Sequence, residues 1–250
     1  MKPEERISAA RLWAAYNYPY LASALFALRF VADERVSHVA GDEYFRVYIS
    51  DEASSALSVD LLGVEMIHQV GHLLRGHASR AREIDLQETD LFRWVDAMDA
   101  ELNDDLQEGD PLPKDSAVHE ELSLPDSLFG EEYFFMGSTR TGKHRDCGSS
   151  AHGNPRLWDE PSPQQSTDGV TAEEKELIKR QVASDALAHQ RNHGSIPLGV
   201  LRWANSLLAP QVDWRSELGA KLRQGISEIT GAVDYSYGRP NRRYAFVPDV

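Results

Sequence analysis

The sequence predicts an α+β protein that is mainly α, with a small β-sheet. Three observations lead to this prediction. Apolar residues recur at helical spacing over much of the chain. Residues 46–50, RVYIS, have the composition of a β-strand. Helix start and stop signals bound the longer helical stretches. With 250 residues, of which 41% are hydrophobic, the chain is long enough to form a proper core.

The elements of the first third follow from these patterns. We expect one or two helices over about residues 4–30, with a break or kink at Pro19. The strand at 46–50 comes next. Residues 51–58 hold several possible helix caps, and 64–77 form a second helix, VEMIHQVGHLLRGH. Most of its positions besides the histidines are apolar, so the imidazoles are expected to face a cavity rather than water.

In the remaining two thirds of the chain, the sequence predicts further helices separated by polar segments. Residues 81–90 form a connection or a short helix, and 91–103 form a second core helix. The acidic, turn-rich stretch 104–132 is mostly loop. The Thr171–Glu174 capping box opens a helix that runs to about residue 191. Two more helices are expected at 198–208 and 213–229.

The composition excludes some functions. The net charge is −14, from 26 Lys and Arg against 40 Asp and Glu, so a nonspecific nucleic-acid binder is not expected. A single cysteine, Cys147, rules out an internal disulfide and suits the cytoplasm. We expect no signal peptide and no membrane span, because no apolar run is long enough.

The segment His68-Gln69-Val70-Gly71-His72 differs by one residue from the zinc-protease pattern H-E-x-x-H. Helical residues four apart lie about 40° apart around the axis. His68 and His72 can therefore share one metal ion, for which zinc is the expected choice. In the pattern, Glu accepts a proton from the metal-activated water.

Here the base position is Gln69, and an amide cannot accept that proton. We therefore expect metal and peptide binding with little or no cleavage. Either the chain is a natural pseudo-enzyme, or an active protease has been disarmed by a Glu→Gln exchange. Retention of both ligands favours the second explanation.

A zinc site needs a third protein ligand. His77 would face the opposite side of a continuous helix, unless Gly76 ends the helix and turns it back. Acids of the next predicted helix are better candidates. Periodicity does not choose between Asp96 and Asp99, whereas Glu101 points elsewhere.

The chain resembles a family of bacterial metallopeptidase domains that precede a von Willebrand factor A-like domain and are often encoded beside a MoxR-type AAA+ ATPase. The resemblance spans nearly the whole chain. It includes residues 19–26 and the Gly/Ser-rich stretch 147–153, as well as 234–243. HQVGHLLRGH is similar to the family's H-E-x-x-H-x-x-x-G-H, and residues 94–103 to its W-N-x-A-x-D-x-x-I-N.

The resemblance implies a zincin-like core with an active-site helix, in which His68, His72 and Asp99 hold zinc. It aligns Asn103 with the family's Asn and Gln69 with the general base. We accordingly divide the chain into a zincin-like metal-binding core (1–136), a long Gly/Ser/Pro-rich loop (137–169), a helical part of the same domain (170–231) and a linker (232–250). The resemblance also implies a protein or peptide substrate, the ATPase as a partner, and an A-like domain that follows Val250 and is absent from this chain.

Other residues are candidates near the site. Cys147, with His144 and His152, could form a second metal site, a nucleophile pair, or a latch in which its thiolate occupies the catalytic zinc. A latch requires the sulfur to lie about 2.3 Å from the metal. Tyr235 could donate a hydrogen bond to an oxyanion.

Three functional hypotheses follow. The first is a zinc-dependent peptidase domain, inactivated by Gln69. The alternative is a catalytically dead, metal-stabilised protein-binding module that works with an AAA+ ATPase. In the third, the histidines pack in a helical domain without metal.

Overall fold

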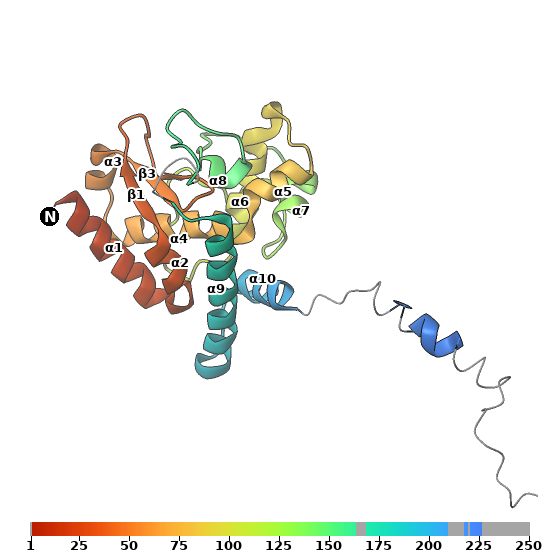
Figure 1. Ribbon diagram of the computed structural model, residues 1–250. Helices are drawn as coiled ribbons and strands as arrows, with labels where there is room; N and C mark the ends of the chain where they lie inside the picture. Colours follow the sequence, from red (N-terminus) through yellow and green to blue (C-terminus); the bar gives the residue numbers. More distant parts are fainter. Residues whose placement is uncertain (1, 164–168, 210–217, 220, 227–250) are drawn as a thin grey trace, which may run out of the picture. The chain divides into compact units, whose positions relative to one another are not determined.

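The computed structural model describes residues 2–163, 169–209, 218, 219 and 221–226. It confirms the predicted fold class, because helices predominate and the strands form one small sheet (Figure 1). Contacts divide the chain into two units, Met1–Leu208 and Ala209–Val250. The candidate site lies in the first unit.

The N-terminal helices are interrupted at Pro19, as predicted. Helix α1 (Pro3–Asn17) is followed by a 3₁₀ turn, η1 (Pro19–Leu21), and by α2 (Ala22–Ala27). Proline has no backbone N–H to donate and clashes with the preceding turn, so α1 cannot continue through it.

The sheet has three strands, β1 (Arg29–Ala32), β2 (Ala40–Gly41) and β3 (Arg46–Ile49), in the order β1-β3-β2. Strand β1 runs parallel to β3, and β2 runs antiparallel to it. The sequence predicted only β3. The predicted helix over 4–30 is wrong at its C-terminal end, because residues 29 and 30 belong to β1. Strand β2 has only two residues, and the residues of β1 continue the apolar spacing of the preceding helices, so neither strand stands out in the sequence.

Helices α3 (Asp51–Ala56) and α4 (Val59–Arg75) begin at serine caps. The Ser50 hydroxyl accepts a hydrogen bond from the Ala53 N–H, and that of Ser58 from the Leu61 N–H. Helix α4 ends at Gly76, whose φ of 66° is left-handed and favours glycine. The chain turns there into α5.

The next elements are mostly short helices that pack against α4 or α6. These are α5 (His77–Glu83), η2 (Glu88–Asp90), α6 (Leu91–Asn103), η3 (His119–Leu122), α7 (Gly130–Met136) and α8 (Ser149–His152). Helix α6 has the predicted bounds. Within 137–169, where a long loop is expected, α8 forms one turn, and its four residues are buried.

Helix α9 (Ala172–His193) begins with the predicted capping box, in which Thr171 and Glu174 bond each other's backbone N–H groups. Helix α10 (Leu198–Leu208) completes the first unit. In the second unit, residues 218, 219 and 221–226 are helical. The linker expected at 232–250, with Tyr235, lies outside the described residues. Within the described residues, no helix has the length and apolarity needed to cross a membrane.

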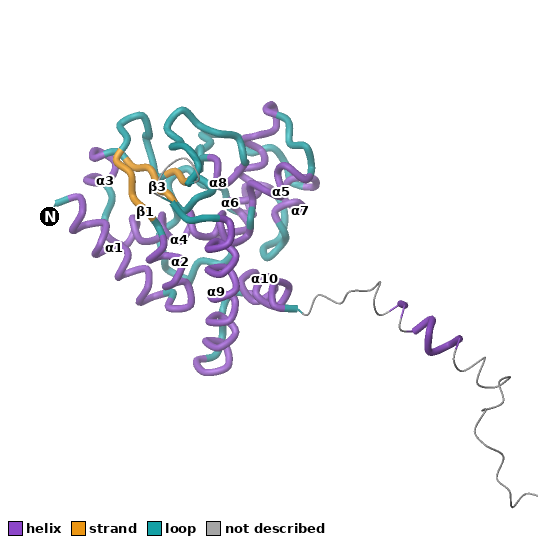
Figure 2. The backbone as a smooth tube through the Cα atoms, viewed as in Figure 1, coloured by secondary structure: helices purple, strands orange, loops and turns teal. Residues whose placement is uncertain are grey.

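The main hydrophobic core packs around α4. It joins residues of α1, α2, α4 and α9 with residues of β3 (Figure 2). Smaller clusters lie between α6 and α7 and between α6 and α8. Helix α4 is therefore held on several sides, and side chains on its inner face have fixed positions.

Candidate metal centre

Helix α4 presents His68 and His72 to the interior from one face. The two rings are 2% and 0% exposed and meet edge to face with centroids 4.7 Å apart. Their Nε2 atoms lie 3.1 Å from each other. This is the arrangement that the i, i+4 spacing predicts.

Helix α6 brings Asp99 to the same point. Its Oδ1 lies 3.2 Å from His68 Nε2 and 3.3 Å from His72 Nε2, and the residue is fully buried. The structure thus brings together the three residues that the family resemblance implies as metal ligands.

Cys147 joins the cluster from the segment before α8. Its Sγ lies 3.4 Å from His68 Nε2 and 3.5 Å from Asp99 Oδ1. The donor atoms of His68, His72, Asp99 and Cys147 all lie within 4.8 Å of one another. Four donors from three separated stretches of chain therefore converge in the interior.

The spacing of the donors fits a tetrahedral zinc ion. With zinc–ligand bonds of about 2.0–2.3 Å, a tetrahedron separates its donor atoms by about 3.3–3.6 Å. Five of the six donor–donor distances are 3.1–3.5 Å, and all six are within 4.8 Å. Imidazole, carboxylate and thiolate are also the ligand types that zinc prefers.

The electrostatics of the cluster favour a bound cation. Burial lowers the pKa of His72 well below its usual value and keeps the ring neutral. Burial alone would raise the pKa of Asp99, but the adjacent imidazoles lower it, so the group stays a carboxylate. Burial raises the pKa of the Cys147 thiol well above normal, so a thiolate there requires a cation. A buried carboxylate is costly without a positive charge beside it.

His77 lies behind His72 rather than among the donors. After α4 ends at Gly76, its Nδ1 comes within 2.8 Å of His72 Nδ1, and its Nε2 lies 3.5 Å from Glu101 Oε2. A proton on His72 Nδ1 in this hydrogen bond leaves the Nε2 lone pair of His72 for a metal. His77 thus orients a ligand, as outer-sphere partners do in zinc sites.

Gln69, at the general-base position, is held by hydrogen bonds on both sides of its amide. Its Nε2 donates to the Val39 carbonyl at 3.3 Å, and its Oε1 accepts from the Ser150 hydroxyl at 3.3 Å. The side chain lies against β2, because a Cβ added to Gly41 would be only 2.7 Å from Gln69 Oε1.

Asp96 and Glu101, the two alternatives to Asp99, do not lie among the donor atoms. Asp96 accepts from His144 Nδ1 at 2.7 Å and lies 3.5 Å from Arg140. Glu101 pairs with Arg75 at 2.7 Å and with Arg80 at 3.1 Å. The helical turn between Asp96 and Asp99 is enough to place them in different surroundings.

Two further candidates serve the surrounding structure. Asn103 donates to the Ser116 hydroxyl and the Ala117 carbonyl, at 2.9 and 2.7 Å. His152 is buried, with its Nε2 3.2 Å from Asp146 Oδ1. Neither belongs to the donor cluster.

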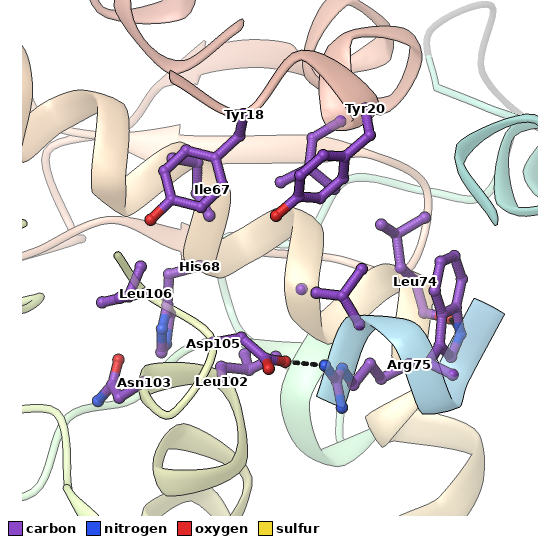
Figure 3. A pocket seen from close by; sticks show the side chains of 14 residues that line it. Tyr18, Tyr20, Ile67, His68, Leu74, Arg75, Leu102, Asn103, Asp105 and Leu106 are labelled. Carbon is purple, nitrogen blue, oxygen red and sulfur yellow. Dashed lines mark hydrogen bonds and ion pairs between the residues drawn. The ribbon is translucent and has the colours of Figure 1, made fainter. Parts of the chain in front are cut away.

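A small apolar cavity lies on one side of His68. Its volume is about 50 Å³, and its walls include Tyr18, Tyr20 and Leu106 (Figure 3). Arg75 and Asp105 form an ion pair in its wall. The cavity has room for a few water molecules but not for a peptide.

Sequence reasoning proposed Cys147 only as one of several candidates near the site. Its adjoining segment is irregular and lies 79 residues from His68 and 48 from Asp99. The available signal was the chemistry of the residue, since the chain has one cysteine and it is flanked by histidines. The ion pair between Glu65 and Arg145, which holds this segment, had no sequence signal.

Comparisons with known proteins give one match. A family model described as "Putative metallopeptidase domain" matches residues 2–248. No curated protein matches the chain. The search of solved structures likewise finds no match.

Proposed function

The chain belongs to the family described as "putative metallopeptidase domain", and we propose that it is a zinc-binding member that does not hydrolyse peptide bonds with the sequence it has. One observation carries the proposal. The donor atoms of His68, His72 and Asp99 converge within 3.1–3.3 Å, while the base position of the same helix carries Gln69.

Zinc bound by these residues would supply Lewis-acid chemistry toward a carbonyl group. Hydrolysis also needs a group that accepts a proton from the attacking water, and the chain does not provide one at position 69. The Gln69 amide cannot take up a proton at neutral pH, and both its polar atoms already have partners. The role that remains is to hold the metal, which would link α4 and α6 in the core. We therefore favour a metal-stabilised module that binds other proteins.

Partners and location are part of the proposal. The resemblance to domains encoded beside MoxR-type ATPases supports an AAA+ ATPase and an A-like domain as partners. A free, buried thiol and the absence of any possible disulfide suit the cytoplasm.

A second candidate is a zincin-like peptidase disarmed at one position. It is favoured by the similar shapes of Gln and Glu, because Gln69→Glu would change a single group and leave His68, His72 and Asp99 in place. Both candidates require zinc, and they differ only in what the Glu variant does.

Metal analysis and a cleavage assay test the proposal. We expect one zinc ion per chain in the wild type, its loss in Asp99→Ala, and its retention in His144→Ala as a matched control. Wild-type and Gln69→Glu proteins are then incubated with candidate partner proteins and a peptide library. If neither protein cleaves any of these substrates, the binding module is supported. Cleavage by the Gln69→Glu variant alone identifies a disarmed peptidase. Cleavage by the wild type, or absence of zinc, would refute the proposal.

A further inference from the structure

The metal centre has a fourth donor that the peptidase pattern does not include. Resting on the proposed metal function, we infer that Cys147 is the fourth ligand and that the segment carrying it, residues 145–150, permanently closes the centre.

The charge of the donor set balances that of zinc. His68 and His72 are neutral ligands, and Asp99 supplies one negative charge. All the donor residues are at most 2% exposed, so three ligands would leave a net positive charge far from water. A Cys147 thiolate brings the cluster of ion and ligands to zero net charge, which is the least costly state for a buried site.

The segment lies on one of the two edges of the sheet to which a substrate strand could add. Strand β2 is at one end of the strand order, with β3 on its other side. Its Gly41 N–H donates to the Cys147 carbonyl at 2.9 Å. Gly148 has a φ of 84°, and a Cβ there would collide with the Gly41 carbonyl oxygen. An extended peptide adding to β2 would need the same backbone group.

Buried contacts fix the segment upstream of the cysteine. Arg145 is 1% exposed and pairs with buried Glu65 through two hydrogen bonds, at 2.8 and 3.2 Å. It also donates to the Val39 carbonyl at 3.0 Å. His38 Nε2 lies 2.7 Å from the Asp146 carbonyl oxygen.

The downstream end is equally held. The Ser150 hydroxyl lies within hydrogen-bonding distance of both the Cys147 carbonyl, at 3.2 Å, and Gln69. The Trp94 indole donates to the Ala151 carbonyl at 2.9 Å. Contacts at both ends make the segment a fixed part of the core. The centre thus has the closed four-ligand shell of structural zinc sites, rather than the open position of catalytic ones.

Cobalt substitution of the purified protein tests the inference. Cobalt(II) replaces zinc in such sites, and a cobalt–thiolate bond adds a charge-transfer absorption in the near ultraviolet. We expect this absorption in the wild type at one equivalent of cobalt. We expect Cys147→Ser to lose this absorption but still to bind cobalt. Its cobalt affinity should fall by more than about 10–100-fold, which is the cost of losing an outer-sphere partner. His144→Ala, in the same part of the chain, should keep the absorption.

A second measurement needs no variant. Because the chain has one cysteine, its reaction with a thiol reagent reports on Cys147 alone. We expect at least about tenfold slower labelling of the zinc-loaded protein than of the chelated protein. Cobalt bound with no thiolate absorption, or labelling indifferent to zinc, would overturn the fourth ligand and leave the proposed function standing. Failure to bind cobalt or zinc at all would instead remove the proposed function.

Discussion

Zinc should contribute several kcal/mol to the stability of this domain, and its removal is the most direct perturbation. Four donors meet in the interior, and the fully buried Asp99 carboxylate is costly without a cation beside it. A ligand that binds only the folded state at 100 times its Kd stabilises that state by about 2.7 kcal/mol. The first unit spans Met1–Leu208. For this size, 1 kcal/mol shifts Tm by about 2–4 °C. Chelation should therefore lower Tm by about 5–11 °C.

The assay is thermal unfolding followed by circular dichroism, at fixed protein concentration, with zinc at 100 times its measured Kd or with excess chelator. Asp99→Asn is the matched variant, because it keeps the shape of the side chain and removes its charge. Its Tm should respond to zinc much less than that of the wild type. A wild-type Tm that differs by less than about 1 °C between the two conditions would refute the reasoning, since no folded-state site would then be linked to stability.

Three more predictions concern the groups around the centre. His77→Ala removes the partner of His72 Nδ1 and should weaken zinc binding about 10–100-fold in competition with a chromophoric chelator; an unchanged affinity contradicts the orienting role. Burial raises the pKa of Asp96 from 3.8 to about 6, so folding stability should fall by up to about 3 kcal/mol as pH rises from 4 to 7. In urea titrations, the unfolding free energy of Asp96→Asn should change less with pH than that of the wild type. Equal pH dependence in the two proteins would exclude Asp96 as the cause. Arg145→Met leaves the Glu65 carboxylate buried and unpaired and should cost about 3–5 kcal/mol of unfolding free energy, which the double variant Glu65→Leu/Arg145→Met should partly restore.

Local patterns predicted the helices because each depends on residues close in sequence. The caps at Ser58 and Thr171 depend on side chains within a turn of each helix start, and the bounds of α6 follow from the helical spacing of its own apolar residues. The same locality explains the misses. Strands β1 and β2 depend on pairing with β3, a contact between separate segments that has no local signature.

The site residues differ in the same way: some could be predicted from nearby sequence and others could not. His68 and His72 could be paired from sequence, because a helix fixes residues four apart. The choice of Asp99 over Asp96 depends on how α6 packs against α4, and periodicity leaves it open. The place of Cys147 depends on a backbone bond to β2 and on the buried Arg145–Glu65 pair, which join parts of the chain 80 or more residues apart. Such contacts follow from the folded topology and have no local signature.

On the proposed function, Gln69 and the segment 145–150 oppose hydrolysis in independent ways. The amide lacks the proton acceptor of the peptidase pattern, and the segment bonds to β2 while its cysteine would complete the donor set. Restoring a carboxylate at position 69 would correct only the first. It would also place a negative charge 3.3 Å from the Val39 carbonyl oxygen, where the amide now donates. The surroundings of Gln69 thus match an amide, which weighs toward the metal-stabilised module and against a peptidase that one substitution would restore.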